Sequence, residues 1–154
     1  MRVVHIRHFK RRAALLGVSA AVVAAAVFLL AGCLGHGGGD TEPILLSSEQ
    51  QRQDYLTGLG WQIRPEPVET LTLQLPRELK ESFGDYIALQ EKQNLPFAQY
   101  GGREVIRYTY AICNYPDYAG DVQVNLFLCD GQLIGGDVIA MGENGFTAGL
   151  SYPQ

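Results

Sequence analysis

The sequence predicts an α+β domain of two layers. We expect an antiparallel sheet of about four strands, with a C-terminal three-strand meander and two helices packed on one face. Two observations support this fold class. Apolar residues recur at helical spacing in two segments and at alternating spacing in residues 68–75, and residues 103–114 are rich in β-branched and aromatic residues. In addition, the last three apolar segments are separated by short turns, which join antiparallel neighbours and leave no room for crossover helices.

The first helix is predicted to start after Ser47 or Ser48, with a glutamine three residues later to complete a capping box. Gly58 or Gly60 is expected to end it. Residues 68–75 alternate between polar and apolar side chains, so they predict a strand with its apolar face on the odd-numbered positions. A second helix is expected over residues 76–93, beginning at a proline.

The three C-terminal strands are predicted at residues 103–114, 121–129 and 132–141. Asp130-Gly131 is a strong signal for a two-residue hairpin turn between the second and third of them. Gly135-Gly136 lies within the last strand and predicts a bulge or a bend. The order helix, strand, helix and then three strands therefore fits a single domain of about 110 residues.

Residues 1–32 have the pattern of a signal peptide. Five basic residues come first, followed by an uncharged and mostly apolar run of 20 residues from Ala13 to Gly32. The run ends in Leu-Ala-Gly-Cys, which resembles the lipobox of bacterial lipoproteins. That resemblance implies that the Cys33 thiol receives a diacylglyceryl group and becomes the mature N-terminus. We therefore predict lipidation at Cys33.

An uncleaved transmembrane helix is the alternative, because 20 residues in a helix span about 30 Å, the thickness of the hydrocarbon core. Under either interpretation, the basic residues precede the apolar run and place the following domain on the extracytoplasmic side of the cell membrane. Residues 33–43 are rich in glycine and predict a flexible tether, which leaves residues 44–154 as a single extracytoplasmic domain.

Composition excludes several function classes for the predicted domain. Residues 33–154 contain seven Lys or Arg and sixteen Asp or Glu, a net charge of −9, so a nucleic-acid-binding surface is not expected. The three histidines, at positions 5, 8 and 36, precede residue 44, which argues against histidine-based catalysis and zinc binding. We therefore predict no catalytic, cofactor-binding or metal-binding residues.

Two cysteines lie in the predicted domain, Cys113 and Cys129. In the predicted hairpin they are about seven residues, or roughly 20 Å, apart along the strands. A disulfide needs Cα atoms within about 7 Å. Two buried free thiols are therefore favoured over a disulfide, and a catalytic thiol is less favoured still because no nearby histidine would activate it.

Carboxylates offer the remaining route to catalysis. Glu69 with Asp137, or Glu143 with either, are pairs that would serve in general acid/base chemistry without histidine. Their spacing favours no particular pair, and solvated charges on strand ends and loops are the simpler interpretation. The serines and glycine pairs match neither a nucleophile elbow nor a phosphate-binding loop.

Tyrosines gather in the C-terminal half of the chain, and two of them share one face of a predicted strand. Exposed tyrosines would form a platform for a glycan or a protein. Cross-strand packing within the sheet is the simpler interpretation. The residues in question are Tyr100, Tyr108, Tyr110, Tyr115, Tyr118 and Tyr152.

Three stretches resemble an uncharacterised bacterial family, domain of unknown function 4830. They are YLTGLGWQIRPEPVE, then LQEKQN followed by YGGREVIRYTY, and finally NYP followed by LIGGDV. The resemblance covers residues 48–150. It implies a small extracytoplasmic α+β domain in an exported or membrane-anchored protein, and it implies no activity, cofactor or catalytic residue.

Together these patterns favour a membrane-anchored extracytoplasmic lipoprotein with a non-enzymatic binding or interaction domain. Its partners would be the membrane, through the N-terminal anchor, and an envelope protein or glycan. Two alternatives stay open: a carboxylate-based hydrolase of envelope polymers, and a small inhibitor or assembly factor of an envelope enzyme. The last would present the Asp130-Gly131 turn or the YPDYAG turn as a wedge.

Overall fold

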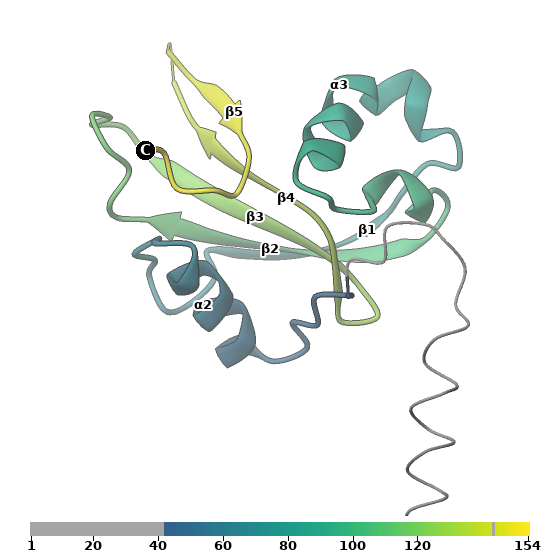
Figure 1. Cartoon of the computed structure of the whole chain (residues 1–154), viewed down its shortest axis with the longest axis horizontal. Coiled ribbons are helices and arrows are strands. Elements are labelled where there is room, and N and C mark those ends of the chain that lie inside the picture. The colour runs from purple at the N-terminus through teal and green to yellow at the C-terminus, as the bar shows by residue number, and fades with distance from the viewer. Residues whose placement is uncertain (1–41, 143) are drawn as a thin grey trace, which may run out of the picture. The chain divides into compact units, whose positions relative to one another are not determined.

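The structure, a computed structural model, describes residues 42–142 and 144–154. The predicted α+β class and C-terminal meander are confirmed (Figure 1). In chain order the described elements are α2 (Glu49–Gly58), β1 (Glu69–Gln74), α3 (Leu79–Lys92), the 3₁₀ helix η1 (Phe97–Tyr100), β2 (Glu104–Ile112), β3 (Val122–Cys129), β4 (Gln132–Ala140) and β5 (Phe146–Ala148).

The sheet contains five strands in the order β1-β2-β3-β4-β5, one more than the predicted four, and each neighbouring pair is antiparallel. The additional strand, β5, has three residues, too few to give an alternating pattern in the sequence. The predicted hairpin turn is confirmed. Asp130 and Gly131 join β3 to β4 with φ values of +50° and +82°, as a type I′ turn requires.

The prediction that both helices cover one face is wrong, because α2 and α3 lie on opposite faces of the sheet (Figure 1). Tyr110 of β2 bonds to Arg52 of α2. Asp137 of β4 bonds to Tyr86 of α3. Asp137 lies in the same row across the sheet as Thr109, which is next to Tyr110. Because successive strand residues point to opposite faces, Asp137 and Tyr110 lie on opposite faces of the sheet.

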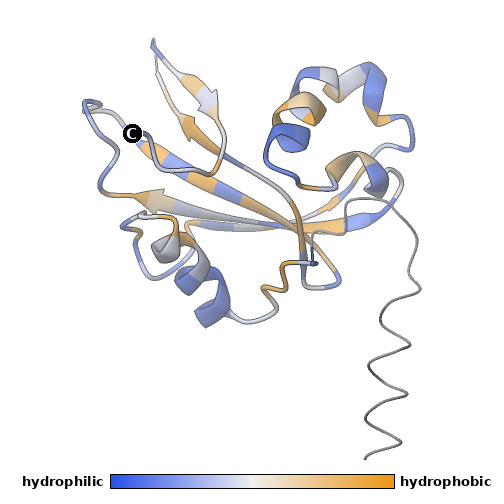
Figure 2. Ribbon diagram, in the orientation of Figure 1, coloured by the Kyte–Doolittle hydropathy of each residue, from blue (hydrophilic) through white to orange (hydrophobic). Residues whose placement is uncertain are grey.

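The described domain therefore has three layers, and the sequences of β3 and β4 explain why. Both strands are buried at nearly every position, including neighbouring residues that face opposite sides. A strand covered on both faces is typically mostly apolar. The hydropathy colouring shows mainly apolar residues along the central strands, interrupted by a few polar ones (Figure 2). Each face has its own core: Trp61, Leu56 and Tyr110 on the α2 side, and Phe97 and Ile134 on the α3 side.

Helix α2 begins and ends with the predicted signals. Ser48 is the N-cap: the Gln51 N–H donates to its Oγ at 3.2 Å, and its own N–H donates to Gln51 Oε1 at 2.9 Å. Gly60, with φ of +98°, turns the chain after the helix, and the Trp61 N–H donates to the Leu56 carbonyl at 3.1 Å. The helix surface is otherwise mainly hydrophilic (Figure 2).

Helix α3 starts at Leu79, later than the predicted Pro76, and it bends at Phe83, whose φ of −130° is not helical. Its last turn covers part of the edge of β4. The Gly136 N–H donates to Gln90 Oε1 at 2.8 Å, and the Gly136 carbonyl accepts from Gln90 Nε2 and Gln93 Nε2 at 3.0 Å each. These glutamine amides replace a neighbouring strand, so the β4 edge is closed where β5 does not reach.

The predicted irregularity in β4 is confirmed beside the two glycines. The register between β3 and β4 shifts next to Gly135, which leaves Ile134 without an opposite residue, as in a β-bulge. A Cβ at Gly135 would lie 2.8 Å from the Phe97 ring, and one at Gly136 would lie 2.7 Å from Leu150. Both glycines therefore permit close packing.

Candidate binding surface

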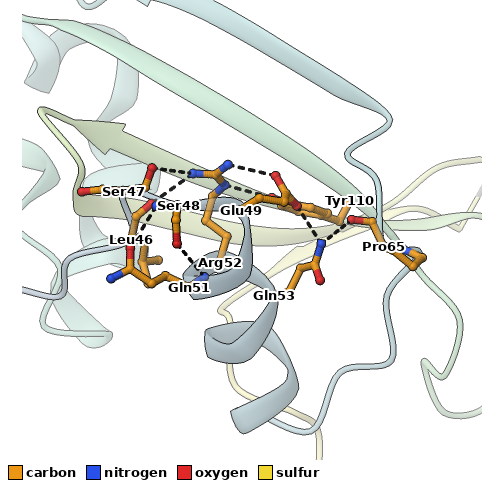
Figure 3. A network of polar contacts seen from close by, with 9 residues as sticks. All are labelled: Leu46, Ser47, Ser48, Glu49, Gln51, Arg52, Gln53, Pro65 and Tyr110. Atoms are coloured by element: carbon orange, nitrogen blue, oxygen red, sulfur yellow. Dashed lines mark hydrogen bonds and ion pairs between the residues drawn. The ribbon is translucent and has the colours of Figure 1, made fainter.

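Arg52 is the centre of a buried polar network between α2 and the sheet (Figure 3). This residue is 6 % exposed. Nε donates to the Tyr110 hydroxyl at 3.0 Å, Nη1 to the Leu46 carbonyl at 3.1 Å and Nη2 to Glu49 at 2.9 Å. The guanidinium also lies 3.8 Å from the ring centroid of Tyr108, within cation–π range.

Glu49, the acidic partner of Arg52, also accepts hydrogen bonds from other residues. Glu49 accepts hydrogen bonds from Tyr110 and Gln53, each at 3.0 Å. Although burial opposes it, the hydrogen bonds from Arg52, Gln53 and Tyr110 lower the pKa of Glu49. Burial raises the pKa of Tyr110 to about 12, so the phenol stays neutral and both donates and accepts. The network is therefore satisfied internally, and it fastens α2 to β2.

This network is not predictable from the sequence alone. Arg52 follows Glu49 at the i+3 spacing of an ordinary surface ion pair, which is worth little in solvent. Its burial follows from the position of α2, since the guanidinium lies over Tyr108 and against Tyr110 on the sheet. A helix with few apolar residues uses this arginine as part of its packing face.

A hollow of about 290 Å³ lies beside Arg52 on the α2 side of the sheet. Its lining combines the apolar side chains of Ile106 and Leu128 with two carboxylates. Ile106 is 36 % exposed and is paired with Thr72 of β1. The hollow therefore lies one strand away from the β1 edge. Its lining is Ser47, Arg52, Glu104, Ile106, Tyr108, Leu128, Asp130 and Gly131.

The six tyrosines do not form an exposed platform, because each is at least half-buried. Tyr108 and Tyr110 share one face of β2, as predicted, and both contact Arg52. Tyr115 stacks on Trp61 with ring centroids 5.8 Å apart, and Tyr152 lies 4.8 Å from the same ring. Several hydroxyls donate within the protein: Tyr100 to Gln132, Tyr118 to the Met141 carbonyl and Tyr152 to the Asn114 carbonyl. The packing interpretation fits this arrangement.

Asp137 is a buried carboxylate on the α3 side of the sheet, 5 % exposed. It accepts hydrogen bonds from the Tyr86 hydroxyl at 2.7 Å and from Asn125 Nδ2 at 2.8 Å. Asn125 in turn accepts from Thr109 at 2.7 Å. Burial raises the pKa of Asp137, although these hydrogen bonds and the charge of Arg107 oppose the shift. Burial beside Asp137 also raises the pKa of Tyr86.

This buried carboxyl predicts a pH dependence of stability. Because the folded state holds the Asp137 proton more tightly than the unfolded chain, the free energy of unfolding should fall as the pH rises from about 4, the ordinary Asp value, to the raised pKa of the folded state. Above that pKa the loss is complete. Asp137→Asn keeps the shape of the side chain and should remove this fall, as measured by urea denaturation at successive pH values. An identical pH profile for the two proteins would contradict the prediction.

The structure does not bring the predicted Glu69–Asp137 pair together. Both lie in one row across the sheet, but β2 and β3 separate them, so their Cα atoms are about three strand spacings, or roughly 14 Å, apart. Glycosidase carboxyls lie about 5–9.5 Å apart. Glu69 instead forms an ion pair with Arg107. Glu143 lies outside the described residues, which contain no group of three or more potential metal ligands.

Both cysteines of the domain are free thiols. Cys129 is buried, as predicted, and contacts the Glu104 carbonyl. Cys113 is exposed, so the prediction that it is buried is wrong. It lies just beyond the end of β2, where its N–H donates to the Gln62 carbonyl and leaves the side chain in solvent. The predicted lipidation residue, Cys33, lies outside the described residues, as do the signal peptide and most of the tether.

Strand β1 forms an open edge of the sheet, since no described strand pairs with its outer side. Five of its six residues are exposed, and Leu71 is 39 % exposed. The Leu75 N–H donates to the Arg103 carbonyl at 2.9 Å, so the odd-numbered residues bond inward to β2. The backbone groups of Thr70, Thr72 and Gln74 therefore point outward.

Proteins commonly protect such an edge with lysine or proline, and the six residues of β1 contain neither. On the opposite side of the sheet, β5 and the glutamines of α3 cover β4, and the edge strand β5 has only three residues. The sequence predicted this strand and its alternation, but it did not show that the strand lies at an edge. That position depends on which strands pair.

Comparison with protein-family models, with curated proteins and with solved structures gives no match to the chain. The resemblance to domain of unknown function 4830 therefore stays a prediction. Among residues 42–142 and 144–154, no helix combines the length and the apolar character needed to span a membrane. Function is accordingly inferred from the open β1 edge.

Proposed function

We propose that this protein is a membrane-anchored extracytoplasmic lipoprotein whose folded domain binds a partner without catalysing a reaction. The open β1 edge is the observation on which the binding role depends. Its outward N–H and C=O groups offer the hydrogen bonds that an added strand needs, and its alternating side chains lie on both faces to contact that strand. A protein segment fits this edge better than a glycan, because the exposed groups are those of a strand backbone.

The polar groups elsewhere support a binding role over hydrolysis. Arg52 and Asp137, the most buried charged side chains, have their hydrogen-bonding atoms directed at partners inside the fold. Glu69 is bound to Arg107, far from Asp137. These groups hold the layers together, so they lack the free geometry of a general acid and base acting on a bound substrate.

The wedge-like inhibitor is also less favoured by the geometry of the turns. The Asp130-Gly131 turn is held by the chain before α2, because the Leu46 N–H donates to the Gly131 carbonyl at 2.8 Å. In the YPDYAG turn, Tyr115 and Tyr118 pack against Phe146 with ring centroids 4.9 and 5.6 Å away. Neither turn presents a free apolar tip.

Photo-cross-linking in cells tests the binding role. With p-benzoylphenylalanine in place of Thr72 in the full chain, we expect a defined cross-linked product on irradiation, because the Thr72 backbone points outward from the β1 edge and its side chain is exposed. The same residue in place of Glu91, exposed on α3, is the matched control and should give several-fold less product. Equal and diffuse products from both positions would contradict the proposal.

A further inference from the structure

We propose that the partner of the β1 edge is a second copy of this chain, paired antiparallel about a two-fold axis at Thr72. The inference rests on the proposed function, since it assigns an occupant to the same edge. A two-fold interface requires a surface that is complementary to itself. The sequence and register of β1 meet that requirement in three ways.

Backbone geometry selects the centre of the pairing. The outward residues of β1 are Thr70, Thr72 and Gln74. Antiparallel pairing of two copies at Thr72 places Thr72 opposite itself and Thr70 opposite Gln74 of the other copy. All three outward residues of each strand then form hydrogen-bonded pairs. A centre at Leu71 would leave Gln74 opposite Val68, which precedes the strand.

The side chains agree with this register. On the α3 side, Leu71 of each copy meets Leu73 of the other, and Leu71 is 39 % exposed in the single chain. Such apolar cross-strand pairs stabilise antiparallel sheets. On the α2 side, Thr72 faces Thr72, a small pair that does not obstruct the approach of the two strands.

The charge around β1 also permits two acidic domains to approach each other. Glu69, the single charged residue of the strand, is bound to Arg107 of its own chain. In the pairing centred on Thr72, the two Glu69 residues lie about 20 Å apart along the strands, beyond the Debye length of about 8 Å at physiological salt. Two like charges therefore do not face each other within the paired strands.

The residues near β1 also carry equal numbers of positive and negative charges. Four arginines and four glutamates lie on β1, within five residues of its ends, or in residues 103–107 around the start of β2. The rest of residues 33–154 has three basic and twelve acidic residues. The edge is thus nearly neutral on a domain of net charge −9, which favours a copy of itself over a strongly charged partner. The residues are Arg64, Arg77, Arg103, Arg107, Glu66, Glu69, Glu78 and Glu104.

Cysteine cross-linking of the full chain in cells tests this pairing. Two copies with different epitope tags are co-expressed, each with Cys113→Ser to remove the exposed thiol. Thr72→Cys should give a disulfide-linked dimer of both tags, because the Cα atoms of opposite residues in a hydrogen-bonded pair are about 5.5 Å apart, within disulfide range. Thr147→Cys, an exposed threonine on β5, is the matched control and should give little dimer.

The register has its own test. Thr70→Cys on one tagged copy and Gln74→Cys on the other should link to each other in preference to forming Thr70→Cys homodimers. Thr72→Pro removes an outward N–H that does not bond to β2, so it should weaken dimerisation at least about tenfold while the far-UV circular dichroism is kept. Sedimentation velocity of the purified full chain in neutral detergent measures this change.

Three outcomes would overturn the inference. Equal dimer yields at Thr72 and Thr147 would indicate random collision. A Thr72 product that contains a different protein and no second copy would overturn the self-pairing while the proposed binding function stands. If Thr72 gives no product with any protein, by disulfide or by photo-cross-linking, both proposals fail.

Discussion

Replacing Trp61 by alanine should lower the free energy of unfolding by about 3–5 kcal/mol, a large share of the roughly 5–15 kcal/mol that stabilises an ordinary domain. The side chain is 1 % exposed, and its Nε1 donates to the Leu150 carbonyl at 2.7 Å. Its ring also contacts the rings of Tyr115 and Tyr152. Truncation would therefore open a cavity where the end of α2, the β2–β3 loop and the C-terminal segment meet.

Urea denaturation followed by far-UV circular dichroism measures this loss, because Trp61 is the single tryptophan of the chain and its fluorescence disappears in the variant. Trp61→Phe is the matched control. It keeps an aromatic ring but leaves the Leu150 carbonyl without its donor, so we expect a smaller loss of about 1–3 kcal/mol. A Trp61→Ala variant within about 1 kcal/mol of the parent protein would contradict this role of the ring.

Cys33→Ala should abolish labelling by radioactive palmitate and leave an unprocessed precursor. The predicted lipidation needs the thiol of Cys33 as the acyl acceptor, and alanine has none. Gel mobility and autoradiography of metabolically labelled cells measure both effects. Cys113→Ser is the control: it also removes a thiol, but one in the folded domain, so labelling and processing should be unchanged.

The two predicted anchors, a lipid on Cys33 and a transmembrane helix, give different results in this labelling experiment. An unlabelled parent protein, with processing unchanged by Cys33→Ala, would mean that the apolar run is a transmembrane anchor.

Cys113 reports the side of the membrane on which the domain lies, because its thiol is exposed whereas that of Cys129 is buried. A membrane-impermeant maleimide should label Cys113 in intact cells, or in spheroplasts where an outer membrane is present. Labelling only after lysis would contradict the extracytoplasmic location.

Local features of the fold were predictable from the sequence because they depend on residues close together in the chain. The capping box at Ser48 and the turn at Asp130-Gly131 are examples. Each is specified by backbone conformations that its own few residues favour. The order of the elements followed from the same kind of signal, apart from β5, whose three residues carry too little pattern to detect.

The candidate site was less predictable, because its parts come together from distant positions. The hollow combines Ser47 and Arg52 with residues of β2 and the β3–β4 turn. Glu69 and Asp137, by contrast, have suitable chemistry for a catalytic pair, but the strand order separates them. Spacing along the chain predicts neither the hollow nor the separation of Glu69 from Asp137, because the distance between residues on different strands depends on which strands pair.

By itself, the sequence determined most of the secondary structure, the antiparallel meander and the acidic, histidine-poor character of the domain. Tertiary structure alone decided that α2 and α3 cover opposite faces, that Arg52 is buried and that β1 is an open edge. The physical reason is that a periodic pattern shows which side of an element avoids water but not which element covers it. That choice depends on how all the layers pack together.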